Sequence, residues 1–457
     1  MAEQTGSSST SSTPSGPKEE TLLENYFLLL SQFAFDKAKE LSEKDKDVHK
    51  LSTAASWGTI IQCLSQLAAA EKMYMSLTFL GQKRFNPIGR ARENLRNNYQ
   101  FLVQEFQRID SLSQTPVTLR SDLDILLAHL SGQLSHYLTA RQRLMDLYEQ
   151  ISSVAVHRNV SFDDLVTMVT DIIQAHSRGF HHPLLSPLKS SFSLECDVMR
   201  HLLEAQILMS EWQCLPSLLQ LHQAHTKLAS WANMAAIKEP ASKDKPTPSK
   251  KGFVSTSKAS VQTGVYHWLA RFKGLLVAKF SLYFYEVLSK QAVPVEMKSW
   301  ASKTTDDFIG KITSFQKKCD AFNVSLVLDS HGLKDTYKGP GYHHPNKITE
   351  APEGLNTFPA ILSIPGERPT SHWPNVVMMI SDKNTPDLSN QDKVNCFYDK
   401  RAQSTYFISR VDPRIYLVVV FETKKSEKDS YVTNFMNDLS LQLRCSKILS
   451  SLKPGSK

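Results

Sequence analysis

The sequence predicts a multidomain protein in which an up-and-down helical bundle precedes a smaller α+β domain. Long amphipathic segments occupy the chain up to Ala235, and short apolar segments with strand character follow Asn323. Between them, residues 237–262 contain almost no large apolar side chains, so they bury too little surface to offset the entropy of ordering. With 457 residues, of which 41% are hydrophobic, the chain is long enough for two or three domains with real cores.

These patterns divide the chain into four parts. We expect a disordered Ser/Thr-rich N-terminus over 1–18, a helical bundle over 19–236, a flexible Lys/Ser/Pro-rich linker over 237–262 and an α+β domain over 263–453.

Apolar residues at helical spacing predict the bundle. A first helix over 22–41 should end at the charged run 43–50, and Gly81 and Pro87 should end the second. Ser161 followed by Phe-Asp-Asp can cap a helix, and Pro216 can start one. Long helices joined by short turns favour an up-and-down arrangement. The expected helices are 22–41, 52–80, 88–112, 119–156, 161–176, 188–213 and 216–235.

The second unit should contain a mainly antiparallel five-stranded sheet with flanking helices, because consecutive strands without intervening helices pair that way. The segment 414–422 is apolar on both faces, which predicts a central strand. Residues 330–358 are rich in Gly and Pro and should form an irregular loop. The expected strands are 323–329, 360–364, 375–381, 404–410 and 414–422, and the expected helices are 265–288, 306–320 and 427–443.

Two similar pieces, Gly179–Pro183 and Gly341–Pro345, each contain a Gly-aromatic-His-His-Pro sequence. Their four histidines suggest zinc, since imidazole suits that ion. The alternative is a pair of turns in which Gly and Pro fix the backbone, the aromatic ring anchors it and the histidines bond locally. Candidate loop residues for an interface or a structural role are Phe180, His181, His182, Tyr342, His343 and His344. Trp373 is either an exposed interface anchor or a filler between sheet and helix.

Sequence motifs give no support to several other functions. The sequence contains no P-loop, dinucleotide-binding or nucleophile-elbow motif. Its formal charge is +8, and residues 237–262 carry six lysines against two acids, a net of +4. Without interleaved Arg and aromatic residues, these lysines do not predict nucleic-acid binding; a solvated linker is favoured over an acidic-lipid patch.

The cysteines, the N-terminal segment and the most apolar segment indicate the cellular compartment. Six scattered cysteines without a Cys-x-x-Cys pair are typical of a reducing compartment. The N-terminus resembles neither a secretory signal nor a transit peptide. The most apolar segment, 274–288, is interrupted by Lys279 and Glu286 and is too short to span a bilayer. We therefore expect a cytoplasmic protein.

From about Leu22 to Gly455, the chain resembles the second-subunit family of the KICSTOR complex in motif order and spacing. The Ser/Thr-rich start is not covered, and the Lys/Pro linker differs from the family's version. The segments that carry the resemblance are Ser177–Pro183, Ser186–Phe192, Leu275–Phe284, Gly341–Pro345, His372–Met378, Ser404–Phe407 and Phe421–Ser430.

The resemblance implies a non-enzymatic scaffold without a cofactor. Its partners would be kaptin, an FG-GAP-repeat subunit and a very large seizure-threshold subunit. This complex sits on lysosomes and recruits GATOR, the GTPase-activating complex for Rag GTPases, so that amino-acid or glucose shortage lowers TOR kinase signalling. The chain would be peripheral on the lysosomal membrane, held there indirectly. The alternative hypothesis is a metal-binding or metal-dependent protein that uses the two His-His loops.

Overall fold

The computed structural model describes most of the chain. The predicted linker and residues 1–17 of the predicted N-terminal segment lie outside the described part. The described residues are 18–48, 56–81, 88–111, 122–157, 161–235, 264–293, 295–297, 299, 306–333, 336–341, 343–344, 346–350, 352–382 and 393–452.

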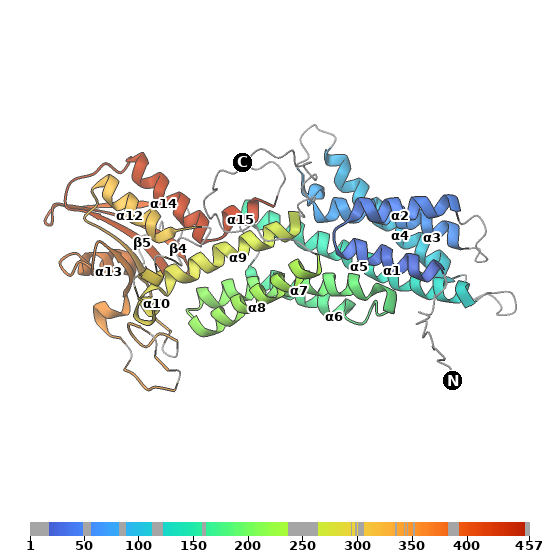
Figure 1. The fold of residues 1–457 in the computed structure, drawn as a ribbon. Helices are drawn as coiled ribbons and strands as arrows, with labels where there is room; N and C mark the ends of the chain where they lie inside the picture. The colour runs from blue at the N-terminus through green and yellow to red at the C-terminus, as the bar shows by residue number, and fades with distance from the viewer. Residues whose placement is uncertain are drawn as a thin grey trace, which may run out of the picture.

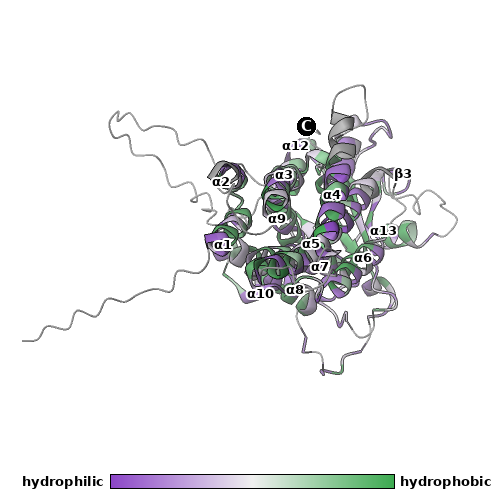
Figure 2. Ribbon diagram, turned by 90° about the vertical axis from the view of Figure 1, so that its right-hand side faces the viewer, coloured by the Kyte–Doolittle hydropathy of each residue, from purple (hydrophilic) through white to green (hydrophobic). Residues whose placement is uncertain are grey.

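The molecule is elongated, with a helical bundle at one end and a sheet with flanking helices at the other (Figure 1). Viewed along the long axis, the bundle helices lie around a shared interior (Figure 2). The helices of the bundle are α1 (Lys18–Ser31), α2 (Phe35–Val48), α3 (Trp57–Met75), α4 (Ile88–Ser111), α5 (Asp122–His157), α6 (Phe162–His176), α7 (Ser186–Ser210) and α8 (Cys214–Met234), with short 3-10 turns η1 (Thr78–Leu80) and η4 (Pro183–Leu185).

The predicted helix start at Ser161 is confirmed by its capping contacts, whereas α8 begins at Cys214, two residues before the predicted Pro216. At α6, the Ser161 hydroxyl accepts a hydrogen bond from Asp164 N, and the Asp164 carboxylate accepts one from Ser161 N. The first predicted helix is wrong in detail: it is two helices, because Phe33 adopts φ 59° between them. The charged run does not end α2, which continues to Val48. Solvated Lys and Glu are good helix formers, so charge alone is a poor stop signal.

The second unit is built on a five-stranded, wholly antiparallel sheet with the order β2-β1-β5-β4-β3. As predicted, the apolar segment near the C-terminus is the central strand, β5, and its side chains enter two different cores. The elements of this second unit are α9 (Gly264–Tyr283), α10 (Tyr285–Gln291), α12 (Phe308–Cys319), β1 (Asn323–Leu328), η5 (Gly354–Thr357), β2 (Ala360–Ile364), α13 (Trp373–Ser381), β3 (Asn395–Asp399), β4 (Ser404–Asp412), β5 (Ile415–Phe421), α14 (Ser430–Leu443) and α15 (Ser446–Ser450).

The prediction of a strand over 375–381 is wrong. That segment belongs to helix α13, with Pro374 in its first turn, where the missing N–H costs nothing. Trp373, Val376 and Ile380 share one face of α13 and pack on the sheet. The remaining strand is β3, which the sequence reading missed. The predicted helix over 265–288 is likewise two helices, α9 and α10, separated at Phe284.

Helix α9 belongs to both ends of the molecule. It contacts α7 and α8 on the bundle side and α12 and β2 on the sheet side. Its residues join a hydrophobic core that runs continuously from α1 to α15. The Trp268 indole N–H donates to the Ile448 carbonyl at 2.9 Å, which ties α9 to α15.

A buried ionic network lies at the centre of the bundle. The Arg141 guanidinium contacts the Glu195 carboxylate at 2.6 Å and the Glu71 carboxylate at 3.1 Å. The hydroxyls of Tyr99 and Tyr137 donate to Glu71, and those of Tyr74 and Tyr148 donate to Glu195. Two carboxylates against one guanidinium leave one excess negative charge, which explains why four hydroxyl donors surround them.

A second buried ion pair joins the bundle to the sheet. Lys279 of α9 lies 2.7 Å from the Asp412 carboxylate at the end of β4, and it donates to the Gln206 amide oxygen of α7 at 3.1 Å. The Tyr283 hydroxyl also donates to Asp412. Within the described residues, no helix is long and apolar enough to cross a membrane.

Candidate interaction surface

A cavity of about 230 Å³ opens where the bundle meets the sheet unit. Its walls come from the turn between α7 and α8, from the α9–α10 region and from residues 336–339, Gly341 and His343. Aromatic rings form much of the lining: the Trp212 ring lies 4.8 Å from Phe284 and 6.3 Å from both Tyr283 and Tyr337, measured between centroids. Pockets with apolar, aromatic walls are typical binding sites.

The α7–α8 turn places Trp212 in this cavity. Trp212 has φ 62°, its N–H donates to Met209 O, and Gln213 N donates to Leu208 O. This is the Schellman pattern of helix termination, usually made by glycine. A tryptophan in the left-handed region is strained. The strain is offset by the three aromatic contacts of the indole ring.

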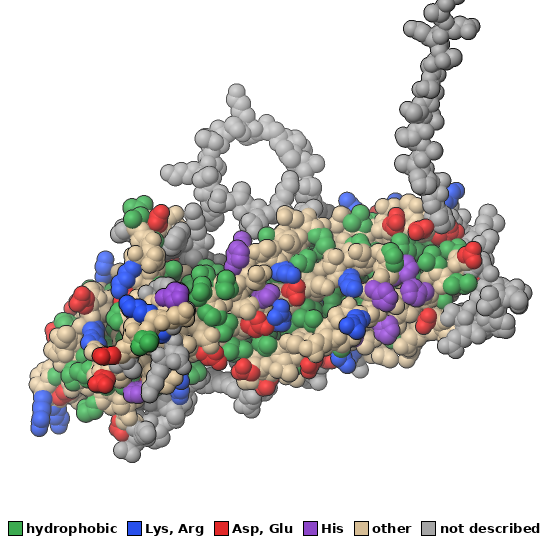
Figure 3. All heavy atoms as spheres, turned by 90° about the horizontal axis from the view of Figure 1, so that it is seen from below, with side chains coloured by type: hydrophobic (Ala, Val, Ile, Leu, Met, Phe, Trp, Pro, Cys, Tyr) green, Lys and Arg blue, Asp and Glu red, His purple; other side chains and the backbone are tan. Residues whose placement is uncertain are grey.

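Three exposed leucines stand beside the cavity at the start of α8. Leu215, Leu218 and Leu219 are 46%, 44% and 55% exposed, and Leu215 also lines the cavity. Figure 3 shows hydrophobic side chains gathered at this junction. We call these three residues the leucine ridge. Contiguous exposed apolar side chains beside a pocket mark protein-interaction sites.

Burial affects two titratable groups at the cavity. Burial raises the pKa of the Cys214 thiol to about 11. Burial also raises the pKa of Tyr337, with a further contribution from Glu286. Both groups are therefore protonated at neutral pH, and a protonated thiol is a poor nucleophile. The cavity is suited to binding an apolar group.

The first His-His loop lies between α6 and α7, far from this cavity. Phe180 is buried, with ring centroids 5.5 Å from Tyr137 and 5.3 Å from Phe192. The His182 ring accepts a hydrogen bond from Leu184 N at 3.2 Å, and His181 N donates to the Gln133 side chain at 2.9 Å. The aromatic residue thus anchors the loop, and His182 bonds locally.

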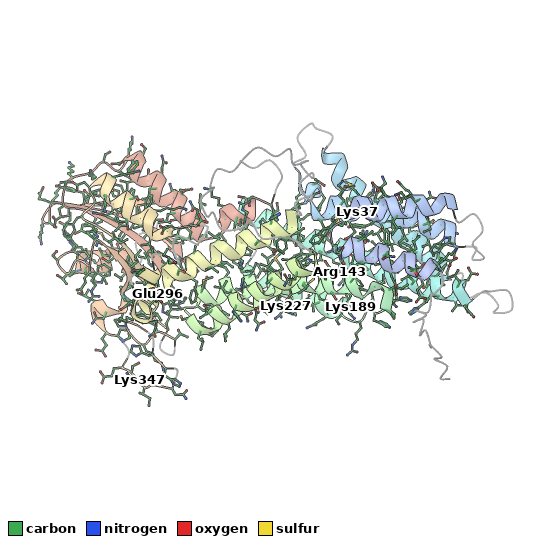
Figure 4. The ribbon with its side chains drawn as sticks, viewed as in Figure 1. Lys37, Arg143, Lys189, Lys227, Glu296 and Lys347 are labelled. Atoms are coloured by element: carbon green, nitrogen blue, oxygen red, sulfur yellow. The ribbon has the colours of Figure 1, made fainter. Side chains whose placement is uncertain are left out.

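The second His-His loop lies at the cavity. His343 is one of its lining residues, and its Nε2 lies 3.2 Å from Pro340 O. The His344 ring accepts from Asn346 N at 3.2 Å. Tyr342 lies outside the described residues. Figure 4 shows how far apart the loops are: Lys189 follows the first, and Lys347 follows the second. The structure therefore does not bring the two histidine pairs together.

Among the described residues, no group of three or more His, Cys, Asp or Glu side chains is placed to hold a metal ion. The metal-binding alternative gains no support from this arrangement. Trp373 is only 2% exposed and donates from its indole N–H to Phe358 O at 3.0 Å. Of the two roles open to it, Trp373 fills the space between sheet and helix.

The sequence reading missed Trp212 and the leucine ridge. A signal for the ridge was present: the buried stripe of α8 runs through Ser217, Leu221, Ala224, Leu228 and Trp231. The three leucines lie off that stripe, so they cannot all enter the same core. Trp212 had no comparable signal, because its position depends on a left-handed turn without glycine.

Comparison with known proteins identifies the family. Residues 12–457 match the family described as "KICSTOR complex C12orf66 like". A KICSTOR subunit 2 from Xenopus laevis is 43% identical over 441 residues, covering 96% of this chain and 97% of that protein. A KICSTOR subunit 2 from Danio rerio is 44% identical over 445 residues, with 96% and 97% covered. Likeness of this extent and coverage shows that the chain belongs to the KICSTOR subunit 2 family.

Proposed function

We propose that the protein is a non-enzymatic scaffold subunit of the KICSTOR complex. In this role it binds kaptin, the FG-GAP-repeat subunit and the large seizure-threshold subunit, and through them GATOR. It thereby helps to lower TOR kinase signalling when amino acids or glucose are scarce. It is cytoplasmic and peripheral on the lysosomal membrane, where its partners hold it. The family match over nearly the whole chain is the observation that carries this proposal.

The leucine ridge and the adjoining cavity support a scaffold role physically. The leucine ridge presents apolar area to solvent, and the adjoining cavity can take one apolar side chain of a partner. Interfaces concentrate their binding energy in such anchor-and-pocket contacts. We propose that a KICSTOR partner subunit docks here. Membership of the complex is a property of the family, and the docking position is our inference from the geometry.

Replacing the leucine ridge with serines (L215S/L218S/L219S) is expected to weaken binding to the partner subunits at least ~10-fold. Three apolar contacts would be lost, and a loss of about 1.4 kcal/mol of binding free energy already lowers affinity tenfold. The measurement is pull-down of each co-expressed partner subunit by the full chain. Because the leucines are exposed, the unfolding midpoint should hardly move.

The matched control is L28S/F101S/I125S, whose side chains are 44%, 45% and 46% exposed on the bundle helices. This control should retain the partners. Equal retention by the ridge variant would reject docking at the junction. If the unmodified chain retained no partner subunit, the scaffold proposal itself would fail.

A further inference from the structure

Histidines gather on the outer face of the bundle, at the loop that joins α6 to α7 (Figure 3). His129 and His136 come from α5, His176 ends α6, and His181 and His182 come from the loop. Arg143 continues the α5 row, since positions 129, 136 and 143 are spaced by two helical turns. We call these six residues the imidazole face.

Contacts between α5 and the loop hold this face together. The ring centroid of His129 lies 5.4 Å from that of His182 and 6.5 Å from that of His181. At the other end of the face, a Cβ placed on Gly179 would stand 3.6 Å from the His136 Cβ and 3.6 Å from the His176 Cα. The imidazoles thus form two neighbouring groups, one around His129 and the other around His136. His129, His136 and His181 are exposed, and His176 and His182 are buried beneath the surface.

Local hydrogen bonds fix how two of the rings present their protons. The His182 Nδ1 accepts from Leu184 N, so the neutral ring carries its proton on Nε2. The His181 Nδ1 lies 3.3 Å from Arg178 O, which can only accept, so Nδ1 is the donor. His176 is 6% exposed, and neither ring nitrogen has a hydrogen-bond partner among the described residues. A buried imidazole without a partner is costly.

The electrostatics of the face favour an anion. The pKa of His182 is lowered by burial and then by His129 and His181. The pKa of His176 is lowered by burial and then by Arg143 and His136. The rings therefore oppose one another's protonation, and a bound anion would remove this repulsion.

The elements around the face carry charges of both signs. Lys189 on α7 and Arg178 in the loop add positive charge. Acidic side chains on the neighbouring helices include Glu19 and Glu20 on α1, Glu105 and Asp110 on α4, Asp122, Asp124, Asp146 and Glu149 on α5, and Asp163, Asp164 and Asp171 on α6.

We propose that the imidazole face binds a phosphate-bearing anion, and that it does so more tightly at mildly acidic pH. Imidazolium and guanidinium groups spread over the face match the several acceptor oxygens of a phosphate. An imidazole gains a positive charge on protonation, so mildly acidic pH makes the surface more attractive to an anion. A metal would instead need converging lone pairs, and Leu184 N already occupies the His182 Nδ1.

The test uses the full chain and inositol hexakisphosphate as the probe. We expect binding to be at least ~10-fold tighter near pH 6 than near pH 8. The NMR resonances of His176 and His182, whose pKa values are lowered in the free protein, should report raised pKa values when the probe is bound. The variant H129Q/R143Q/H181Q should lose at least ~10-fold in affinity near pH 6 together with most of the pH dependence. All three side chains are exposed, so folding should be unaffected.

The control H222Q/R271Q/H344Q removes the same residue types from exposed positions elsewhere and should bind like the unmodified chain. Phosphatidylcholine vesicles with or without a phosphoinositide distinguish the two sources of the phosphate. Binding to phosphoinositide vesicles indicates a lipid headgroup, whereas binding of the soluble probe alone indicates a free phosphate compound. No binding of either probe near pH 6, or an equal loss in the control, overturns the proposal.

Discussion

Replacing Arg141 with methionine is expected to lower the free energy of unfolding by about 3–5 kcal/mol, because Glu71 and Glu195 would remain buried without their cation. Arg141 is 1% exposed, so water cannot replace it. Urea-induced unfolding, followed by circular dichroism at neutral pH, measures the loss.

Arg143 provides the matched control, because it lies two residues further along the same helix and is exposed. R143M should change the free energy of unfolding by no more than about 0.5 kcal/mol. Equal stability of R141M and the unmodified chain would show that the tyrosine hydroxyls alone can hold both carboxylates. The neutral combination R141M/E71Q/E195Q should regain part of the loss, since it removes the unpaired charges.

The second large effect is expected at the junction of the two ends. K279M should lower the free energy of unfolding by about 3–5 kcal/mol, because it leaves the Asp412 carboxylate buried and, within the described part of the chain, with the Tyr283 hydroxyl as its side-chain donor. Lys279 is 0% exposed. Since Lys279 also binds Gln206 of α7, amide hydrogen exchange should rise at the end of β4 and in the last turns of α7.

K290M is the control, since Lys290 lies on α10 with its side chain 55% exposed, and within the described part of the chain its ion pair is with Glu286. It should leave unfolding and exchange nearly unchanged. K279M/D412N should be more stable than K279M, because no buried charge is then left unpaired. If the double variant were less stable than K279M, the ion-pair explanation would be wrong.

The sequence was sufficient for the class of each unit and for most long elements. Apolar spacing located the bundle helices, and the two-faced apolar segment correctly marked β5 as central. It failed at α13, where Val and Ile have strand propensity but the sheet surface and Pro374 favour a helix. Tertiary packing overrides a local preference in such short segments.

The buried ion pairs could not be predicted from the sequence. Lys279 looked like an interruption of an apolar segment, yet it is a fully buried residue whose partner lies 133 positions away along the chain, at Asp412. Glu71, Arg141 and Glu195 are also distant in sequence and meet only when three helices pack. Only part of the imidazole face could be predicted from the sequence. His181 and His182 are adjacent in the chain, whereas His129 and His136 reach the face from α5.

Helix α9 has a mechanical consequence for the protein. Twenty residues of helix span about 30 Å, and this rod is embedded in the bundle along one part and against the sheet along another. A push on the sheet is therefore transmitted to the bundle without an intervening hinge within α9. Proteins attached at the two extremities would be kept at a set spacing and orientation, as by a strut.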